Sequence, residues 1–269
     1  WLGGSLLVIS TVLMACGGSA EDPEFLLDIP ALEAQGGPTG TGGVNGLPPS
    51  AYHANVVGLI AAMSVAAADP NDGTKVNPAL ESTGLLGTAD GRTVFGYAAK
   101  CALPVGTQLT SNGETYSGGG MLSTTSGWVT GALTTAQQEN VLSCMIAHLN
   151  AVGAHVSIFL SGPCVTTGES SDDGGYSVEE AVFQAQIPGG GQAPIYYAWP
   201  RTNLLNVCGL LSATSWITRI CGGPLNTCGV QIRYDQASAC TGSNGNYTCD
   251  GEAAIQTTLK DGELCDLYQ

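Results

Sequence analysis

The sequence contains few cations. Lys and Arg together number 7 against 22 Asp and Glu, so the net charge is −15 at neutral pH. The cations form no cluster that could neutralise the phosphates of a nucleic acid, which excludes nucleic-acid binding. The same balance excludes adsorption to anionic lipid head groups by charge alone.

Familiar catalytic and cofactor motifs are absent as well. The sequence has no Gly-x-Ser-x-Gly, His-Glu-x-x-His, Ser-x-x-Lys, Cys-x-x-Cys or phosphate-binding glycine loop. Asp69, Asn71 and Asp72 precede Gly73, but their spacing does not fit a calcium-binding EF-hand loop. We therefore expect no cofactor and no bound metal.

The longest apolar stretch, at the beginning of the sequence, is shorter than the about 20 residues of a membrane-spanning helix. It ends in Leu13-Met14-Ala15-Cys16, which is typical of the lipobox of a bacterial lipoprotein. This pattern predicts a signal peptide over residues 1–15, cleaved before Cys16, whose sulfur would carry a diacylglycerol. We expect attachment through this lipid in the bacterial cell envelope, at the outer membrane, facing the periplasm or the surface.

Composition also indicates an extracytoplasmic protein. Charged residues make up 11% of the chain and there are 39 glycines, so the surface must consist largely of small and uncharged polar residues. Residues 16–49 are rich in glycine and predict a flexible tether after the lipidated cysteine, although the segment from Phe25 to Leu32 could dock on the domain or on a partner. Residues 50–200 predict an α+β core, and residues 201–269 a cysteine-rich, loop-rich part of the same disulfide-braced domain.

The most regular stretch runs from Thr134 to Gly162. Thr134 with Gln137, or Thr135 with Gln138, predicts a capping box at the start of a helix, which we expect to end at Gly153. After it, Val156, Ile158 and Leu160 alternate with residues that would occupy the other face of a strand. Further helices are predicted from Ser50 and from Asp90 as the N-cap, and Asn112-Gly113 predicts a type I′ hairpin.

The sequence has 10 cysteines, and nine of them follow Cys16. A secreted chain should pair them, so the odd number leaves one over, for which Cys164 is the candidate. Cys101 and Cys144 each lie on or beside the buried stripe of a predicted helix, and two helices packed together would allow a disulfide between them. Cys208 and Cys221 are the expected pair in the C-terminal part.

The segments Lys100-Cys101-Ala102-Leu103 and Ser143-Cys144-Met145-Ile146-Ala147-His148-Leu149-Asn150, with a later Glu-Glu-Ala-x-Phe run, support one resemblance. The chain resembles a group of uncharacterised cysteine-rich bacterial lipoproteins over roughly residues 92–234. The resemblance implies an envelope location and a disulfide-braced fold, and it assigns no activity.

Two functions follow from these patterns. The first is a binding or structural role at the envelope, with a protein or glycan as a partner that the sequence does not identify. The alternative is an envelope hydrolase that uses His148 or His155 with a carboxylate, for which Glu179 and Glu180 are the candidates.

Overall fold

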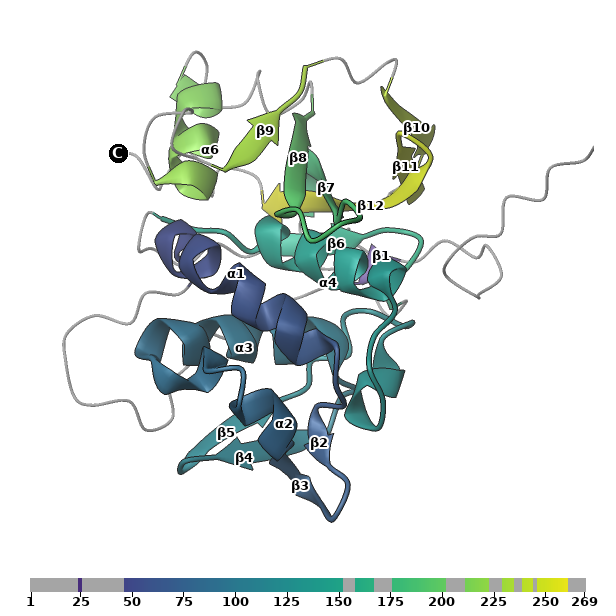
Figure 1. Ribbon diagram of the computed structural model, residues 1–269. Coiled ribbons are helices and arrows are strands. Elements are labelled where there is room, and N and C mark those ends of the chain that lie inside the picture. Colours follow the sequence, from purple (N-terminus) through teal and green to yellow (C-terminus); the bar gives the residue numbers. More distant parts are fainter. Residues whose placement is uncertain are drawn as a thin grey trace, which may run out of the picture.

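The computed structural model describes residues 24–25, 46–151, 158–166, 176–201, 211–222, 229–234, 239–243 and 246–260. These residues form an α+β fold in which a layer of helices lies between two sheets (Figure 1). The helices are α1 (Pro49–Met63), α2 (Pro78–Glu81), α3 (Ala89–Ala102), α4 (Thr135–Ala147) and α6 (Leu211–Cys221), with short 3-10 turns at Leu85–Gly87 and Ser126–Val129.

The larger sheet has the strand order β1-β6-β12-β7-β8-β9, and the β10–β11 hairpin continues from β12. Its pairs are antiparallel except for β8 with β9, which is parallel. The strands are β1 (Glu24–Phe25), β6 (Ile158–Ser161), β7 (Tyr176–Gln186), β8 (Ile195–Pro200), β9 (Val230–Ile232), β10 (Cys240–Ser243), β11 (Asn246–Cys249) and β12 (Glu252–Lys260).

The smaller sheet has the order β2-β3-β4-β5 and covers the opposite side of the helices. It consists of β2 (Ala68–Asp69), β3 (Asp72–Val76), β4 (Gln108–Ser111) and β5 (Glu114–Ser117). Asn112 and Gly113 have φ values of 52° and 84° between β4 and β5, as a type I′ turn requires. The predicted hairpin is confirmed.

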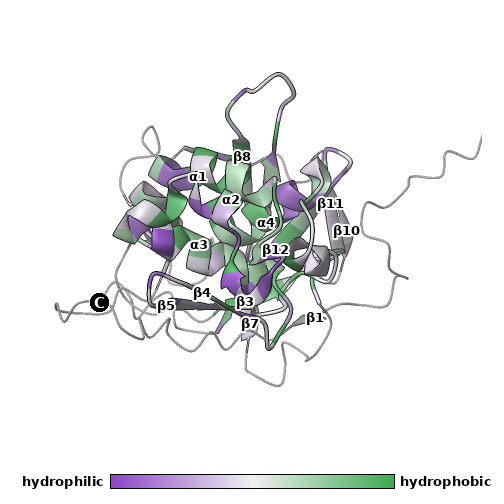
Figure 2. Ribbon diagram, turned by 60° about the horizontal axis from the view of Figure 1, so that its bottom comes forward, coloured by the Kyte–Doolittle hydropathy of each residue, from purple (hydrophilic) through white to green (hydrophobic). Residues whose placement is uncertain are grey.

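One apolar core joins the helical layer to both sheets. Figure 2 shows hydrophobic residues concentrated along α1, α4 and the neighbouring strand β8. A second, smaller core lies on the other face of the larger sheet, where Val182 and Trp199 pack beneath the β10–β11 hairpin. The larger sheet is therefore covered on both faces over its central strands.

The alternation expected around Ile158 is present in the described part of the strand, because Ile158 and Leu160 lie in the main core and Phe159 does not. All four residues of β6 are nevertheless buried, so both faces of this strand are covered. The Glu24–Phe25 backbone pairs with β6. It therefore docks on the domain, which was one of the two alternatives for that segment, the other being a partner.

Two predicted helix ends require correction. The capping box of Thr134 and Gln137 is present, but α4 ends with His148 as its C-cap rather than at Gly153, because Leu149 leaves the helix to bridge with Leu47. Gly153 lies outside the described residues. The N-cap of α3 is Thr88 instead of Asp90, since the Thr88 side chain accepts a hydrogen bond from the Gly91 amide.

The C-terminal part contains more regular structure than its composition suggested. Strand β12 occupies a central position in the larger sheet, and its Gln and Thr side chains are buried between neighbouring strands. Because these side chains are polar, the sequence of β12 does not show the apolar pattern of a buried strand. No helix in the described ranges is long and apolar enough to cross a membrane.

Cysteines brace this fold in the oxidised form. Disulfides join Cys101 to Cys144 and Cys240 to Cys249. The Cα atoms of the first pair are 6.2 Å apart, so the predicted bond between α3 and α4 is present. The expectation that Cys164 is the unpaired cysteine is wrong, because Cys164 is disulfide-bonded, as is Cys221. Cys208, the expected partner of Cys221, lies outside the described residues.

Candidate functional site

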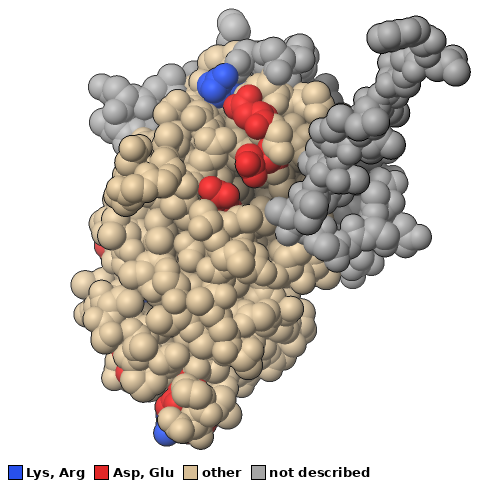
Figure 3. All heavy atoms as spheres, turned by 45° about the vertical axis from the view of Figure 1, so that its right-hand side comes forward, with Lys and Arg blue, Asp and Glu red and all other residues tan. Residues whose placement is uncertain are grey.

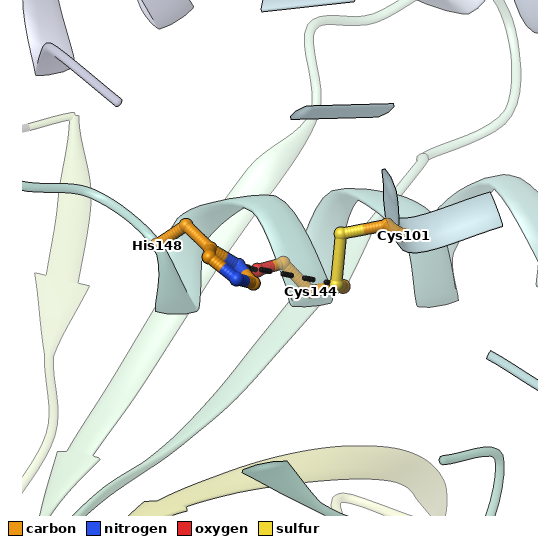
Figure 4. Close-up of side chains that lie close together, drawn as sticks. All are labelled: Cys101, Cys144 and His148. Carbon is orange, nitrogen blue, oxygen red and sulfur yellow. Dashed lines mark hydrogen bonds between the residues drawn. A yellow bond between two sulfur atoms is a disulfide. The ribbon is translucent and has the colours of Figure 1, made fainter. Parts of the chain in front are cut away.

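The densest group of chemically reactive side chains in the described part of the chain lies between α3 and α4. Cys101 on α3 is bonded to Cys144 on α4, and His148 follows one helical turn after Cys144 (Figure 4). The Sγ atom of Cys144 lies 4.0 Å from His148 Nδ1 and 3.9 Å from the Sδ atom of Met121. All four side chains are buried.

The surroundings of His148 fix both its tautomer and its charge. Its Nδ1 lies 2.7 Å from the Cys144 carbonyl oxygen, which can only accept, so Nδ1 carries the proton and donates it. Burial lowers the pKa of His148 to about 4, an effect that outweighs this hydrogen bond. The imidazole is therefore neutral at physiological pH.

The Cys101, Cys144 and His148 donor atoms all lie within 4.8 Å of one another, a spacing that suits a metal ion. Zinc and copper(I) bind cysteine as the thiolate, however, and both sulfurs here are bonded to each other. As a disulfide, the group does not provide a metal-ligand set. It functions as a covalent link between two core helices.

A second buried polar centre lies between β7 and α6, where Glu180 of β7 forms an ion pair with Arg219 of α6. Both side chains are almost completely buried. The Thr257 hydroxyl donates to Glu180 Oε2 at 2.6 Å, and Arg219 Nη1 donates to the Leu149 carbonyl oxygen at 2.7 Å. These partners satisfy much of the hydrogen-bonding capacity that burial would otherwise leave unmet.

A β-bulge directs Glu180 into the core. On β12, Thr257 pairs with Ala181 and Thr258 pairs with Glu179, so the register passes over Glu180. The extra residue rotates the local strand direction, as a bulge does. Glu180 thereby reaches the side of the sheet on which α6 supplies Arg219.

The predicted catalytic residues are therefore distributed over different environments. Glu180 is connected to His148 only indirectly, through Arg219 and the backbone of Leu149. Glu179 is on the solvent side of the bulge, where Arg201 Nε donates to it at 3.2 Å. His155 lies outside the described residues. Sequence reasoning missed Arg219, because a single Arg in the last turn of a helix gives no distinctive signal.

Cations are almost fully engaged across the molecule, and all 7 of them lie in the described part. Burial lowers the pKa of Lys100. Of the other six, four form ion pairs, and the remaining two lie over aromatic rings. The ion pairs are Lys75–Asp72, Arg92–Glu114, Arg201–Glu179 and Arg219–Glu180; Arg233 lies over Tyr197 and Lys260 over Tyr176.

The surface reflects this shortage of free positive charge. Figure 3 shows a face composed mostly of uncharged residues, with acidic side chains gathered toward one end.

No protein-family model, curated protein or solved structure matches this chain.

Proposed function

We propose that this protein is a lipoprotein of the bacterial cell envelope, attached through a lipid on Cys16, whose domain has a binding role. The signal peptide of residues 1–15 is removed in this proposal, and the glycine-rich segment after Cys16 connects the lipid to the domain. The domain faces the periplasm or the cell surface from the outer membrane.

Cysteine oxidation supports an extracytoplasmic location. None of the cysteines in the described part of the chain is free, and two disulfides fall entirely within that part. Structural disulfides persist in oxidising compartments such as the periplasm and are rare in the cytosol. This observation agrees with the Leu13-Met14-Ala15-Cys16 pattern, which was identified independently of the later cysteines.

The burial of His148 and Glu180 favours a binding role over hydrolysis by this pair. His148 is 5% exposed and Glu180 is 0% exposed, so neither can contact a substrate in the folded domain. A general base must come within hydrogen-bond reach of the proton it removes. His148 donates to a backbone carbonyl and Glu180 neutralises Arg219, and both roles stabilise the fold.

The partner is uncharged in this proposal. With a net charge of −15 and six of its seven Lys and Arg side chains held by a carboxylate or an aromatic ring, the protein repels polyanions and offers them no cation cluster. A neutral glycan or an uncharged protein surface fits the composition better.

Fractionation of a bacterial host that expresses the chain with a complete signal peptide tests the anchoring. The wild-type protein should partition with the outer membrane, and Cys16→Ser should be released into the soluble fraction. Ser19→Ala, which leaves the lipobox intact, is the matched control and should remain with the membrane. Sedimentation of Cys16→Ser with the membrane, with an acyl group still present, would refute the proposal.

A further inference from the structure

The outer face of the larger sheet, opposite the helices, carries a row of amide and aromatic side chains near its β9 edge. Gln184 on β7 pairs with Tyr197 on β8, and Tyr197 pairs with Gln231 on β9. Tyr197 packs against the second core, which lies on this face. Since residues paired across a sheet share a face, Gln231 also points away from the helices.

Tyr197 is held in place from within the protein. Its ring centroid lies 5.6 Å from that of Trp199, which is completely buried beneath the β10–β11 hairpin. The guanidinium of Arg233 lies 5.6 Å from the centroid of the Tyr197 ring. Tyr197 nevertheless remains half-buried and Gln231 is exposed, so the row reaches solvent at this end.

The chemistry of the row suits a carbohydrate. A fixed aromatic ring packs against the C–H face of a pyranose, while amide and guanidinium groups form hydrogen bonds with hydroxyls in their plane. Neighbouring strands are about 4.8 Å apart, which is close to the length of one sugar unit. Adjacent positions in the row could therefore contact successive sugars of one chain.

The charge of the protein favours neutral over acidic carbohydrates. The row contains no carboxylate, and the cation beside it, Arg233, lies over the Tyr197 ring. Long-range repulsion from a chain of net charge −15 acts against acidic polysaccharides. We propose that Tyr197, Gln231 and Arg233 form a binding site for a neutral polysaccharide, an inference that specifies the partner of the binding role proposed above.

An added peptide strand is the main competing occupant of this edge, and the backbone disfavours it. Strand β9 contains three residues. On one side of it, Gly229 has φ of +67° and lies so close to the His53 ring that a Cβ atom would be 2.5 Å from Cε1. The edge is too short to pair with an extended peptide along several residues.

The test uses purified Cys16→Ser protein, so that the result does not depend on lipidation. Isothermal titration calorimetry would measure binding of two neutral probes, the hexamer of β-1,4-linked N-acetylglucosamine and the hexamer of β-1,4-linked glucose. Polygalacturonate serves as the acidic probe. Fluorescence of Trp199, which contacts Tyr197, provides an independent signal.

We expect saturable binding of at least one neutral probe and none of polygalacturonate. Tyr197→Leu, which keeps an apolar side chain against the second core, should weaken binding about tenfold, equivalent to about 1.4 kcal/mol. Gln231→Ala should weaken it severalfold without affecting the fold, because its side chain is exposed. Gln108→Ala, at an exposed position on β4 of the other sheet, is the matched control and should bind like the parent.

The site would be overturned if the folded parent protein bound neither neutral probe. It would also be overturned if both single variants, Gln231→Ala and Tyr197→Leu, bound with unchanged affinity. Preferential binding of polygalacturonate would also overturn it. None of these results bears on membrane anchoring, which is read separately by fractionation, so failure of the site and failure of the anchor are distinguishable.

Discussion

Removal of the Cys101–Cys144 disulfide should cost the domain a large part of its stability. The bond closes a loop with a sequence separation of 43 residues. In the chain-entropy treatment, a loop of that length contributes about 4 kcal/mol at 25 °C by restricting the unfolded chain. Since the net stability of a domain is only about 5 to 15 kcal/mol, the double variant Cys101→Ala/Cys144→Ala should be markedly destabilised.

The second disulfide provides an internal control of the same chemistry. Cys240 and Cys249 are separated by 9 residues, so the same treatment assigns their bond about 2.6 kcal/mol. Replacing both of these by alanine should therefore cost less. Cys101 and Cys144 are both fully buried, and the space left by their sulfurs increases the difference in the same direction.

Urea unfolding followed by circular dichroism would give the two free energies, and calorimetry the melting temperatures. For a domain of this size, about 4 kcal/mol corresponds to a fall of about 8 to 16 °C. The reasoning from loop length would be refuted if Cys101→Ala/Cys144→Ala lowered the free energy of unfolding by less than about 1 kcal/mol. It would also be refuted if this decrease were no greater than that of the Cys240/Cys249 variant.

Three further predictions concern the buried polar groups and one close backbone contact. Glu180→Leu alone should destabilise the domain by about 3 to 5 kcal/mol, because Arg219 stays buried without its counter-charge. Glu180→Leu combined with Arg219→Met should cost much less. If urea titrations give equal losses for the two proteins, the buried ion pair is contradicted. Because the pKa of His148 is about 4 in the folded protein and about 6.5 in the unfolded chain, the unfolded state binds a proton first as pH falls, so stability should decline between pH 6.5 and pH 4. His148→Asn, which keeps a donor for the backbone carbonyl, should reduce this decline, and an unchanged pH profile would argue against a buried neutral imidazole. Gly229→Ala should lower the melting temperature through its clash with His53 and its positive φ, and combination with His53→Ala should recover the part that is due to the clash.

Local signals predicted the features that depend on residues close together in sequence. The capping box at Thr134, the Asn112-Gly113 hairpin and the helical stripes that contain Cys101 and Cys144 all follow from side-chain chemistry within one or two turns. The disulfide between the two stripes could be predicted because a buried face on each helix has few partners available.

Features that depend on the sheet could not be predicted in this way. The position of β12 between β6 and β7 is a long-range pairing, and its buried Gln256, Thr257 and Thr258 do not read as core residues. The ion pair of Glu180 depends on a bulge that no sequence pattern marks and on Arg219 from a distant helix. The early end of α4 likewise follows from a bridge to Leu47, far away in the sequence.

The most direct test of the envelope assignment is the mass of the mature N-terminal peptide. The protein would be produced in a bacterial host with its complete signal peptide, extracted from membranes with detergent and digested without reduction. The account predicts that the first residue is Cys16 and that its sulfur carries a diacylglycerol. A peptide that still contains residues 1–15, or a Cys16 that carries no lipid or takes part in a disulfide, would contradict it.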